Sequence, residues 1–372
     1  MMNKKFTKYL RWVLLGFFLI MVTREAYLHQ VQGGGVAPSI HALCPYGALE
    51  SLYILVFTGT FLQKIFSGTM ILLGITLILA LIFRRSFCGL ICPFGTLQEF
   101  VGIIGKKIFR KRFIMHSKID KPLRYLKYIV LLGTLYFAWQ TTGLWVDPYD
   151  PWAAYGHISA GITSLTTEYL VGTIMLVIVL VGSMLYDRFF CKYLCPMGAV
   201  YGIISKISPS KIVRNEDACV NCGLCSKSCP MNIKVANVKE VTSAECISCQ
   251  RCVISCPKKD ALEYKTGKKK LKTLTVIILV IGLFFTGVFI SKSTGIFQVL
   301  PQKITEESKL NIDDIKGYMT IKEVSIGTKI ELKEVYKKLE IPNSIREDTK
   351  LKDVKNFVDG FEVEVAKEKL KE

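Results

Sequence analysis

The chain has 372 residues, enough for two or three domains, and 51% of them are hydrophobic. The formal net charge is +19, but residues 300–372 carry 15 Lys and Arg against 16 Asp and Glu, so the positive excess lies upstream. The apolar residues fall in blocks with basic residues beside them, a pattern that indicates membrane topology. No nucleic-acid-binding motif accompanies the charge, so the composition argues against a nucleic-acid partner.

The first apolar block runs from Trp12 to Val22 behind several lysines and an arginine. This pattern is shared by signal peptides, but those end in a small-residue cleavage site. Thr23-Arg24-Glu25 stands there instead. We therefore expect a retained first span at about 9–28, with the N-terminus in the cytoplasm.

Further apolar stretches have lengths near the roughly 20 residues that cross a bilayer. They predict spans at 69–83, 124–142, 169–186 and 273–290. The stretch 52–66 is shorter and contains a glycine and a lysine, so we interpret it as interfacial or re-entrant. The count is then about five spans.

Basic residues concentrate in 84–127 and 187–272, whereas 143–168 has none. The positive-inside rule places the basic segments in the cytoplasm. Five spans then put 300–372 outside. The basic segment 106–112 is expected on the membrane surface, near anionic lipid headgroups.

Two segments that follow predicted spans align without a gap, 103 residues apart. Each has the pattern R-x-F-C-x3-C-P-x-G, beginning at Arg85 and at Arg188. The match indicates a duplicated two-span unit. Its cysteines are Cys88, Cys92, Cys191 and Cys195. Each pair could lie on one turn of helix, with both sulfurs on one face.

Four thiolates suit a third iron-sulfur cluster or a soft metal such as Cu(I). A reversible dithiol and simply packed cysteines are the alternatives.

Residues 219–257 contain C-x2-C-x2-C-x3-C-P twice, the pattern of bacterial two-cluster ferredoxins. In that pattern the fourth cysteine of each run binds the other 4Fe-4S cluster. Cluster one is then assigned Cys219, Cys222, Cys225 and Cys256, and cluster two is assigned Cys246, Cys249, Cys252 and Cys229. Closed tetrahedral zinc sites do not require eight duplicated cysteines with paired prolines. Such clusters require a reduced compartment, which places this part in the cytoplasm.

The remaining candidates are single residues. Cys44-Pro45-Tyr46-Gly47 resembles half of the duplicated motif but lacks a partner cysteine, so we expect Cys44 to stand alone on the outer side in a structural role. No histidine lies inside a span opposite another, which does not favour haem. Candidate proton acceptors of an outer quinol site are His29, His41, His157, Asp147 and Asp150. For the two aspartates, turn formation beside proline is the preferred alternative.

Together, the duplicated F-C-x3-C-P-x-G motif and the two-cluster ferredoxin run resemble the NapH/NosR-type membrane iron-sulfur proteins, over about residues 1–260. They are also similar to related oxidase-assembly proteins that reduce copper. The resemblance implies an integral electron carrier between a quinol pool or cytoplasmic donor and partner redox enzymes. The flavin domain of NosR-like proteins is missing, and residues 273–372 lie outside the shared core.

We therefore expect a polytopic α-helical membrane protein with an inserted α+β dicluster ferredoxin domain and a small, mainly helical C-terminal domain. The expected boundaries are 1–210 for four spans, 211–265 for the ferredoxin, 273–290 for the fifth span and 300–372 for the outer domain. The expected function is single-electron transfer through two 4Fe-4S clusters. The electrons pass between a cytoplasmic redox partner, such as a ferredoxin or flavodoxin, or a quinol pool, and a membrane partner, such as an oxidoreductase subunit. Lys258, Lys259 and Lys268 to Lys270 either steer that acidic partner or merely enforce topology. The alternatives are a quinol dehydrogenase or copper reductase at the C-x3-C-P site, or a redox-dependent assembly or sensing protein.

Overall fold

The computed structural model describes residues 2–58, 66–141, 145–300, 310–312, 315, 317, 319–354, 357–358, 360–361 and 363–371. The chain divides into two compact units. The first comprises residues 1–27 and 39–299, and the second comprises 28–38 and 300–372. The described residues are mostly helical.

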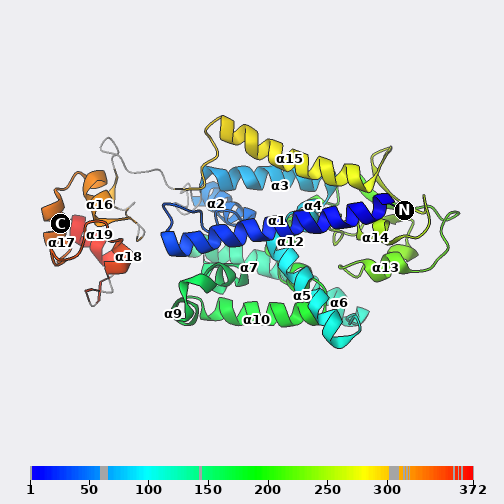
Figure 1. Ribbon diagram of the computed structural model, residues 1–372, viewed down its shortest axis with the longest axis horizontal. Coiled ribbons are helices and arrows are strands. Elements are labelled where there is room, and N and C mark those ends of the chain that lie inside the picture. Colours follow the sequence, from blue (N-terminus) through cyan, green and yellow to red (C-terminus); the bar gives the residue numbers. More distant parts are fainter. Residues whose placement is uncertain are drawn as a thin grey trace. The chain divides into compact units, whose positions relative to one another are not determined.

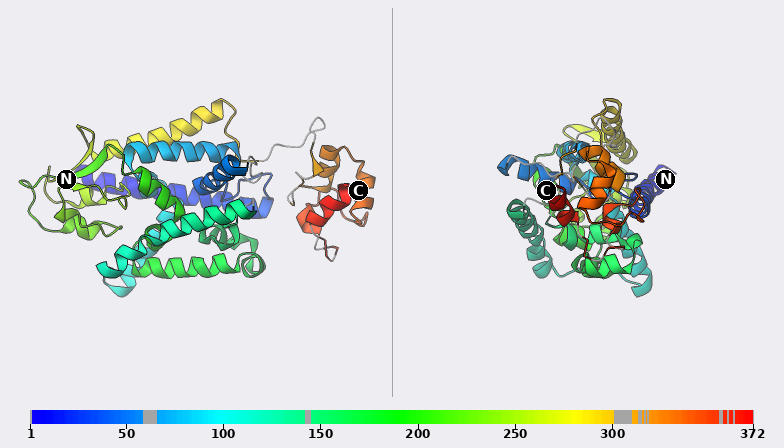
Figure 2. Two further views of the ribbon diagram at one scale, coloured as in Figure 1. Left: turned by 180° about the vertical axis from the view of Figure 1, so that it is seen from behind. Right: turned by 90° about the vertical axis from the view of Figure 1, so that its left-hand side faces the viewer.

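Long apolar helices form the body of the first unit, and α1, α3, α10 and α15 run lengthwise through it (Figures 1 and 2). The helices up to the ferredoxin module are α1 (Met2–Gln32), α2 (Pro45–Thr58), α3 (Ser67–Phe83), α4 (Ser86–Leu90), α5 (Pro93–Phe109), α6 (Ser117–Leu123), α7 (Leu126–Thr141), η1 (Asp147–Tyr149), α8 (Pro151–Gly156), η2 (Ile158–Ala160), α9 (Ile162–Thr167), α10 (Leu170–Leu185), α11 (Phe189–Tyr193) and α12 (Pro196–Ile204). After the ferredoxin module comes α15 (Thr273–Ser293).

Two of these helices, over Lys4–Gln32 and Thr273–Ser293, are long and apolar enough to cross a membrane. Shorter apolar helices cover Pro45–Phe57, Ser67–Phe83 and Leu170–Leu185. Helix α15 exposes Ile278, Phe285 and Phe289, as expected for a lipid-facing surface. The long helices lie where the apolar runs predict spans. The proposed interfacial stretch 52–66 coincides in part with α2, and its residues 59–65 lie outside the described residues.

The ferredoxin module combines a small sheet with short helices. Its elements are β1 (Ser210–Arg214), α13 (Leu224–Ser228), η3 (Val235–Asn237), β2 (Glu240–Val241), α14 (Arg251–Ser255), β3 (Leu262–Thr266) and β4 (Lys269–Leu271). The strands are antiparallel in the order β2-β1-β3-β4, with Ile212 opposite both Val241 and Tyr264. The expected boundary at 265 is too early, because β3 continues through a turn at Gly267, with φ of 58°, into β4.

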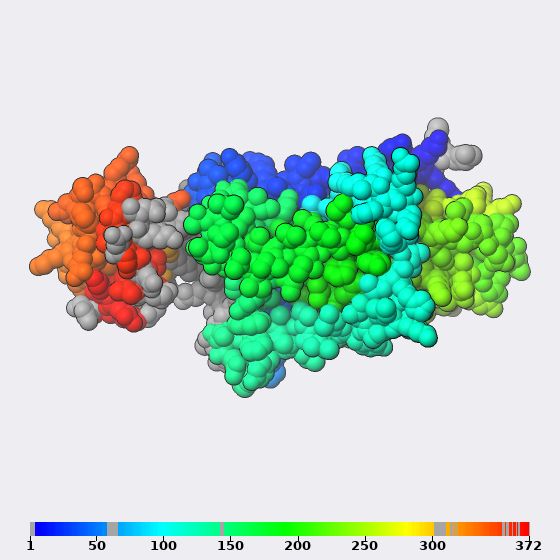
Figure 3. All heavy atoms as spheres, turned by 90° about the horizontal axis from the view of Figure 1, so that it is seen from below, coloured from blue at the N-terminus to red at the C-terminus, as the bar shows by residue number. Residues whose placement is uncertain are grey.

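One hydrophobic core joins this module to the helices, since Ile247 and Cys249 belong to the same buried cluster as Leu79 and Tyr201. In Figure 3 the yellow-green ferredoxin residues lie directly against the cyan residues around α5 and α6. At the N-terminal end, the Lys4 ammonium donates to the Cys256 carbonyl oxygen at 2.7 Å.

The second unit has its own core. Its described helices are α16 (Ile321–Thr328), α17 (Leu332–Lys338), α18 (Leu351–Val354) and α19 (Val363–Lys371). They bury Val324, Val335 and Leu370 among others. A capping box between Thr320 and Glu323 starts α16.

Candidate functional site

The eight ferredoxin cysteines gather into two groups of four, each around its own cavity. One cavity is lined by Cys219, Cys222, Cys225 and Cys256, and the other by Cys229, Cys246, Cys249 and Cys252. These are the two sets that the spacing assigns to separate clusters. Each set takes three cysteines from one run and one from the other.

Each C-x3-C pair of the duplicated motif spans a break between two helices. Cys88 lies in α4 and Cys92 caps α5, while Cys191 lies in α11 and Cys195 caps α12. The expectation that each pair occupies one helical turn is therefore wrong. The reason is the following proline, which favours the first position of a new helix and disrupts a continuing one.

The four cysteines of the two repeats come together. Cys92 and Cys195 interact electrostatically with both Cys88 and Cys191. The amides of Gly95 and Gly198 donate to the sulfurs of Cys92 and Cys195. Gln98 fixes another sulfur, because its Nε2 donates to the Cys191 Sγ at 3.3 Å. Burial raises the pKa of the Cys88 and Cys92 thiols.

In the described part of the chain, no three His, Cys, Asp or Glu side chains are arranged to share one metal ion. This applies equally to the ferredoxin cysteines and to the four membrane-domain cysteines. A cubane distributes its four cysteines over four irons, so its ligands need not converge as closely as those of a single ion. The donor set of four buried or half-buried thiols fits such a cluster.

Two buried arginines cross between the repeats. Arg85 of the first repeat lies against Gly198 of the second, where a Cβ would be 2.8 Å from its Nη2. Arg188 of the second repeat lies against Gly95 of the first, where a Cβ would be 2.6 Å from its Nη1. The glycine of each C-P-x-G turn therefore leaves room for the arginine of the opposite repeat. Arg188 also donates to the Cys88 carbonyl oxygen at 2.6 Å.

Two carboxylates anchor these arginines, and they come from different parts of the chain. Glu99 of α5 pairs with Arg11, Arg188 and Arg251 at 2.8 to 3.0 Å. Glu245, directly before Cys246, pairs with Arg85 at 3.3 Å and also with Lys127. These ion pairs join the helices to the ferredoxin module. They were not identified from the sequence, because the partners of Glu245 are more than 100 residues away.

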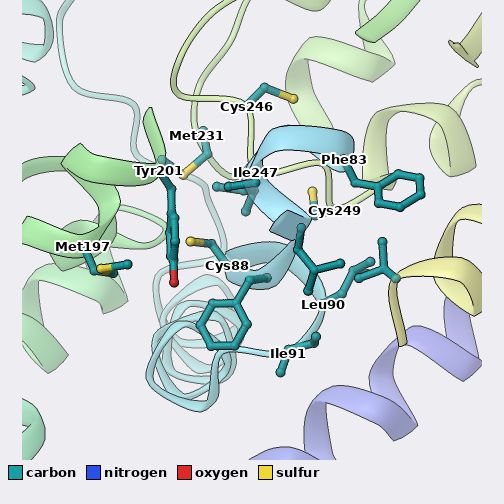
Figure 4. Packing of buried hydrophobic residues seen from close by; sticks show 14 of the residues in the cluster. Phe83, Cys88, Leu90, Ile91, Met197, Tyr201, Met231, Cys246, Ile247 and Cys249 are labelled. Carbon is teal, nitrogen blue, oxygen red and sulfur yellow. The ribbon is translucent and has the colours of Figure 1, made fainter. Parts of the chain in front are cut away.

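A direct backbone contact joins the second ferredoxin cysteine set to α4. Gly89, next to Cys88, lies so close to the ferredoxin loop that a Cβ would collide with the Ile247 carbonyl oxygen and lie 3.0 Å from the Cys249 Cα. Figure 4 shows Cys249 and Ile247 beside the short segment that carries Cys88 and Leu90. Only glycine permits this approach.

A cavity of about 270 Å³ adjoins the cysteines of the repeats. It is lined by three Cys-Pro steps that each begin a helix: Cys44-Pro45, Cys92-Pro93 and Cys195-Pro196. Much of the remaining lining is aromatic, including Trp145, Tyr149 and Trp152. The expectation that Cys44 stands alone is therefore wrong. The C-P-x-G pattern shared by all three segments was the signal for this convergence.

Titratable groups surround one side of this cavity. Asp150 lines it, and His41 Nε2 lies 2.8 Å from the Asp147 Oδ1. Burial raises the pKa of Asp150, and it raises the pKa of nearby Glu50 to about 8. Asp150 also accepts from the Trp152 amide, so it has the turn role that its position before proline predicts. His157 stacks on Tyr169, and His29 lies in the second unit, 2.8 Å from the Ala37 carbonyl oxygen.

The basic segment 106–112 does not face lipid throughout. Lys106 and Arg112 pair with buried Asp187, and Arg112 also donates to the Cys229 carbonyl oxygen. Arg124 donates to the Met231 carbonyl oxygen at 2.9 Å. Part of the expected lipid-binding charge thus holds the ferredoxin module to the helices, while Lys107, Arg110 and Lys111 stay exposed.

Comparisons with known proteins agree with this arrangement. A family model described as a 4Fe-4S binding domain matches residues 66–112 and 169–215, the two C-x3-C-P repeats, and a 4Fe-4S dicluster domain matches 211–257. YccM of Escherichia coli (strain K12), whose description assigns it provisionally to electron transport, is 31% identical over 274 residues, covering 70% of this chain and 74% of YccM.

Two further relatives extend the match. An uncharacterised protein of Methanocaldococcus jannaschii, MJ0750, is 32% identical over 61% of this chain and 88% of its own length. The ferredoxin-type protein NapH of Haemophilus influenzae is 30% identical over 50% of this chain and 64% of NapH. The chain belongs to the NapH/NosR-type iron-sulfur protein family. No solved structure matches it significantly.

Membership in the NapH/NosR-type family identifies 4Fe-4S clusters as the cofactors and electron transport as the general role. The spanning-length helices and the exposed apolar surface agree with a membrane location. Its relatives also include NirI, the ferredoxin-type protein NapH and the regulatory protein NosR. A role in electron transport requires a redox partner in general.

Proposed function

We propose that this protein passes single electrons between a soluble partner at the cytoplasmic face and a membrane partner, through two ferredoxin clusters and a third thiolate-bound centre. Cysteines 219, 222, 225 and 256 would hold cluster one, and 229, 246, 249 and 252 would hold cluster two. Cys88, Cys92, Cys191 and Cys195 would hold the third. Iron-sulfur clusters supply one-electron transfer at potentials set by charge, hydrogen bonds and solvent exposure.

The observation that carries this proposal is the contact of Gly89 with Cys249. It brings Cys249, a proposed ligand of cluster two, next to Cys88, which supports a continuous series of the three thiol groups. The first group is partly exposed, with Cys222 facing solvent. The second and the repeat cysteines are largely buried, as suits transfer to a membrane partner.

The proposed topology has five spans, formed by α1, α3, α7, α10 and α15, with α2 as a shorter piece. The ferredoxin module and N-terminus face the cytoplasm, in line with the positive-inside rule. The contact of Lys4 with Cys256 supports placing the N-terminus and the ferredoxin module on the same side of the membrane. Residues 300–372 would then lie outside, as a separate domain.

Iron and acid-labile sulfide per chain, measured anaerobically, test the third centre. We expect about twelve irons in the native protein and about eight after serine replaces Cys88, Cys92, Cys191 and Cys195. About eight irons in both proteins would refute the third centre and leave an ordinary two-cluster carrier.

A second function, quinol oxidation, is favoured by the apolar aromatic cavity beside these cysteines. A two-electron quinol there could release its electrons singly to the cysteine site, and its two protons to Asp150 and the groups around His41. Val179→Phe should fill the cavity and abolish oxidation of a menaquinol analogue while retaining iron, because Val179 is fully buried on its lining. Val177→Phe, exposed on the same helix, is the matched control. If the Val179→Phe variant oxidised the menaquinol analogue as fast as the Val177→Phe control, a quinol site in this cavity would be refuted.

A further inference from the structure

The residues around the repeat cysteines carry more positive than negative charge. Arg11, Arg85 and Arg188 are at most 2% exposed, and a guanidinium does not lose its proton in proteins. Glu99 is shared by Arg11, Arg188 and the partly exposed Arg251, while Glu245 is shared by Arg85 and Lys127. Two carboxylates therefore face four arginines and a lysine. Buried charge is costly unless an opposite charge compensates it.

Two of the arginines that contribute this surplus positive charge lie near the four cysteines. Arg85 interacts electrostatically with Cys88, Cys191 and Cys195, and Arg188 interacts with Cys191. The buried Nε atoms of both arginines have no hydrogen-bond partner among the described residues. Packed thiols and a disulfide are both neutral, so neither would compensate these arginines. A cluster bound by four thiolates is anionic and would.

We propose that Arg85 and Arg188 are the counter-ions of an anionic four-thiolate iron-sulfur centre at Cys88, Cys92, Cys191 and Cys195, and that they raise its reduction potential. This inference rests on the third centre of the proposed function. Adding one electron, drawn from the adjacent ferredoxin cluster, increases the negative charge of the site by one and forms or breaks no bond. Nearby fixed positive charges favour that more negative state.

The duplication makes the two arginines a matched pair. Each reaches the C-P-x-G turn of the other repeat, so each lies beside cysteines of both halves. Each also shares its carboxylate with another cation. After Arg85→Gln, Glu245 keeps Lys127, and after Arg188→Gln, Glu99 keeps Arg11 and Arg251. Neutral substitution therefore removes surplus charge without leaving a carboxylate unpaired.

The test is an anaerobic potentiometric titration of the full chain in detergent, followed by electron paramagnetic resonance. The signal lost when serine replaces the four cysteines identifies the third centre. Arg85→Gln and Arg188→Gln should each lower its potential, changing the reduced-to-oxidised ratio at fixed potential about tenfold, or about 59 mV for one electron. The potentials of Arg85→Lys and Arg188→Lys should stay close to the native value, because lysine keeps the positive charge and loses only the planar guanidinium group.

Cluster one is the internal reference, since its cysteines are partly exposed and solvent screens charge there, so its potential should not move. Unchanged third-centre potentials in both Gln variants would overturn the counter-ion role, as would equal shifts in the Gln and Lys variants. A shift confined to cluster two would also overturn it. If the Arg188→Gln protein loses iron, the third-centre potential of the Arg85→Gln protein alone tests the counter-ion role, and an unchanged value overturns it. Failure of the third centre itself is a different result, namely about eight irons and no third signal in the native protein.

Discussion

The two cysteine sets of the ferredoxin module derive from runs with the same cysteine spacing, yet their surroundings differ. The set of Cys219, Cys222, Cys225 and Cys256 includes an exposed residue and two half-buried ones, whereas Cys229, Cys246, Cys249 and Cys252 are all buried. Glu216, before the first run, is half exposed and pairs with Arg214 and Lys239 on the surface. Glu245, before the second run, is largely buried and pairs with Arg85 and Lys127 of the helices.

Two runs of equal cysteine spacing therefore end in unequal surroundings, because the second run docks against the helices. The loop of the second run fits against the helices because small residues lie opposite it. Gly89 allows the Cys249 backbone to approach closely. At Gly202, an added Cβ would lie 3.7 Å from the Ala244 carbonyl oxygen. At the position equivalent to Gly202, the first repeat has Glu99. The repeats thus differ where the ferredoxin module docks.

The largest expected effect comes from Glu245→Gln compared with Glu216→Gln. Loss of Glu245 leaves Arg85 and Lys127 without a carboxylate, which typically costs about 3–5 kcal/mol for a buried pair. Loss of the half-exposed Glu216 should cost about 1 kcal/mol or less. Thermal denaturation of both variants in the same detergent measures this contrast. Equal midpoints would mean that the two runs are anchored equally.

A smaller effect is expected from Gly89→Ala. The added methyl must displace the loop of Ile247 and Cys249, and overpacking of this kind typically costs about 1–3 kcal/mol. Because the docking contact is disturbed and the ferredoxin cysteines are not, cluster content should persist while electron transfer from the module to the membrane site slows. Stopped-flow reduction of the proposed third centre measures the rate. Gly74→Ala is the control, since a Cβ there meets nothing within 4 Å. A native rate in Gly89→Ala would remove this contact from the electron path.

Much of this arrangement follows from local sequence patterns. The apolar runs locate the long helices, closely for 169–186 and α10 at Leu170–Leu185, whereas α1 at Met2–Gln32 begins seven residues before the predicted 9–28. The cysteine spacing predicts which four ferredoxin cysteines share a cavity, because the pattern constrains both runs at once. Pro93 and Pro196 were sufficient to predict the break inside each C-x3-C-P motif, although a single helical turn was the interpretation chosen.

Other features depend on contacts between distant segments. The exchange of Arg85 and Arg188 between repeats requires the relative orientation of the two halves, which no local pattern specifies. Lys127 lies in a predicted span, where a charge is costly, and its ion pair with the distant Glu245 offsets the cost of its burial. Cys44 joins the other Cys-Pro steps because α2 packs against α3 and α7, an arrangement the short apolar run 52–66 does not reveal.

The smallest expected effect concerns the exposed side of the module. Lys258 and Lys259 are exposed, and Lys258 lines the cavity of the first cysteine set. If this side receives an acidic soluble partner, Lys258→Glu with Lys259→Glu should slow reduction by ferredoxin or flavodoxin several-fold at low ionic strength, because charge steering acts on the association rate. The effect should vanish near 1 M salt, where the Debye length is about 3 Å.

The control is Lys333→Glu with Lys337→Glu, which makes the same change in net charge on α17 of the second unit and should leave the rate unchanged. Equal slowing by both pairs would indicate a response to net charge alone, and the exposed cysteine set would then have no preferred role in meeting the partner.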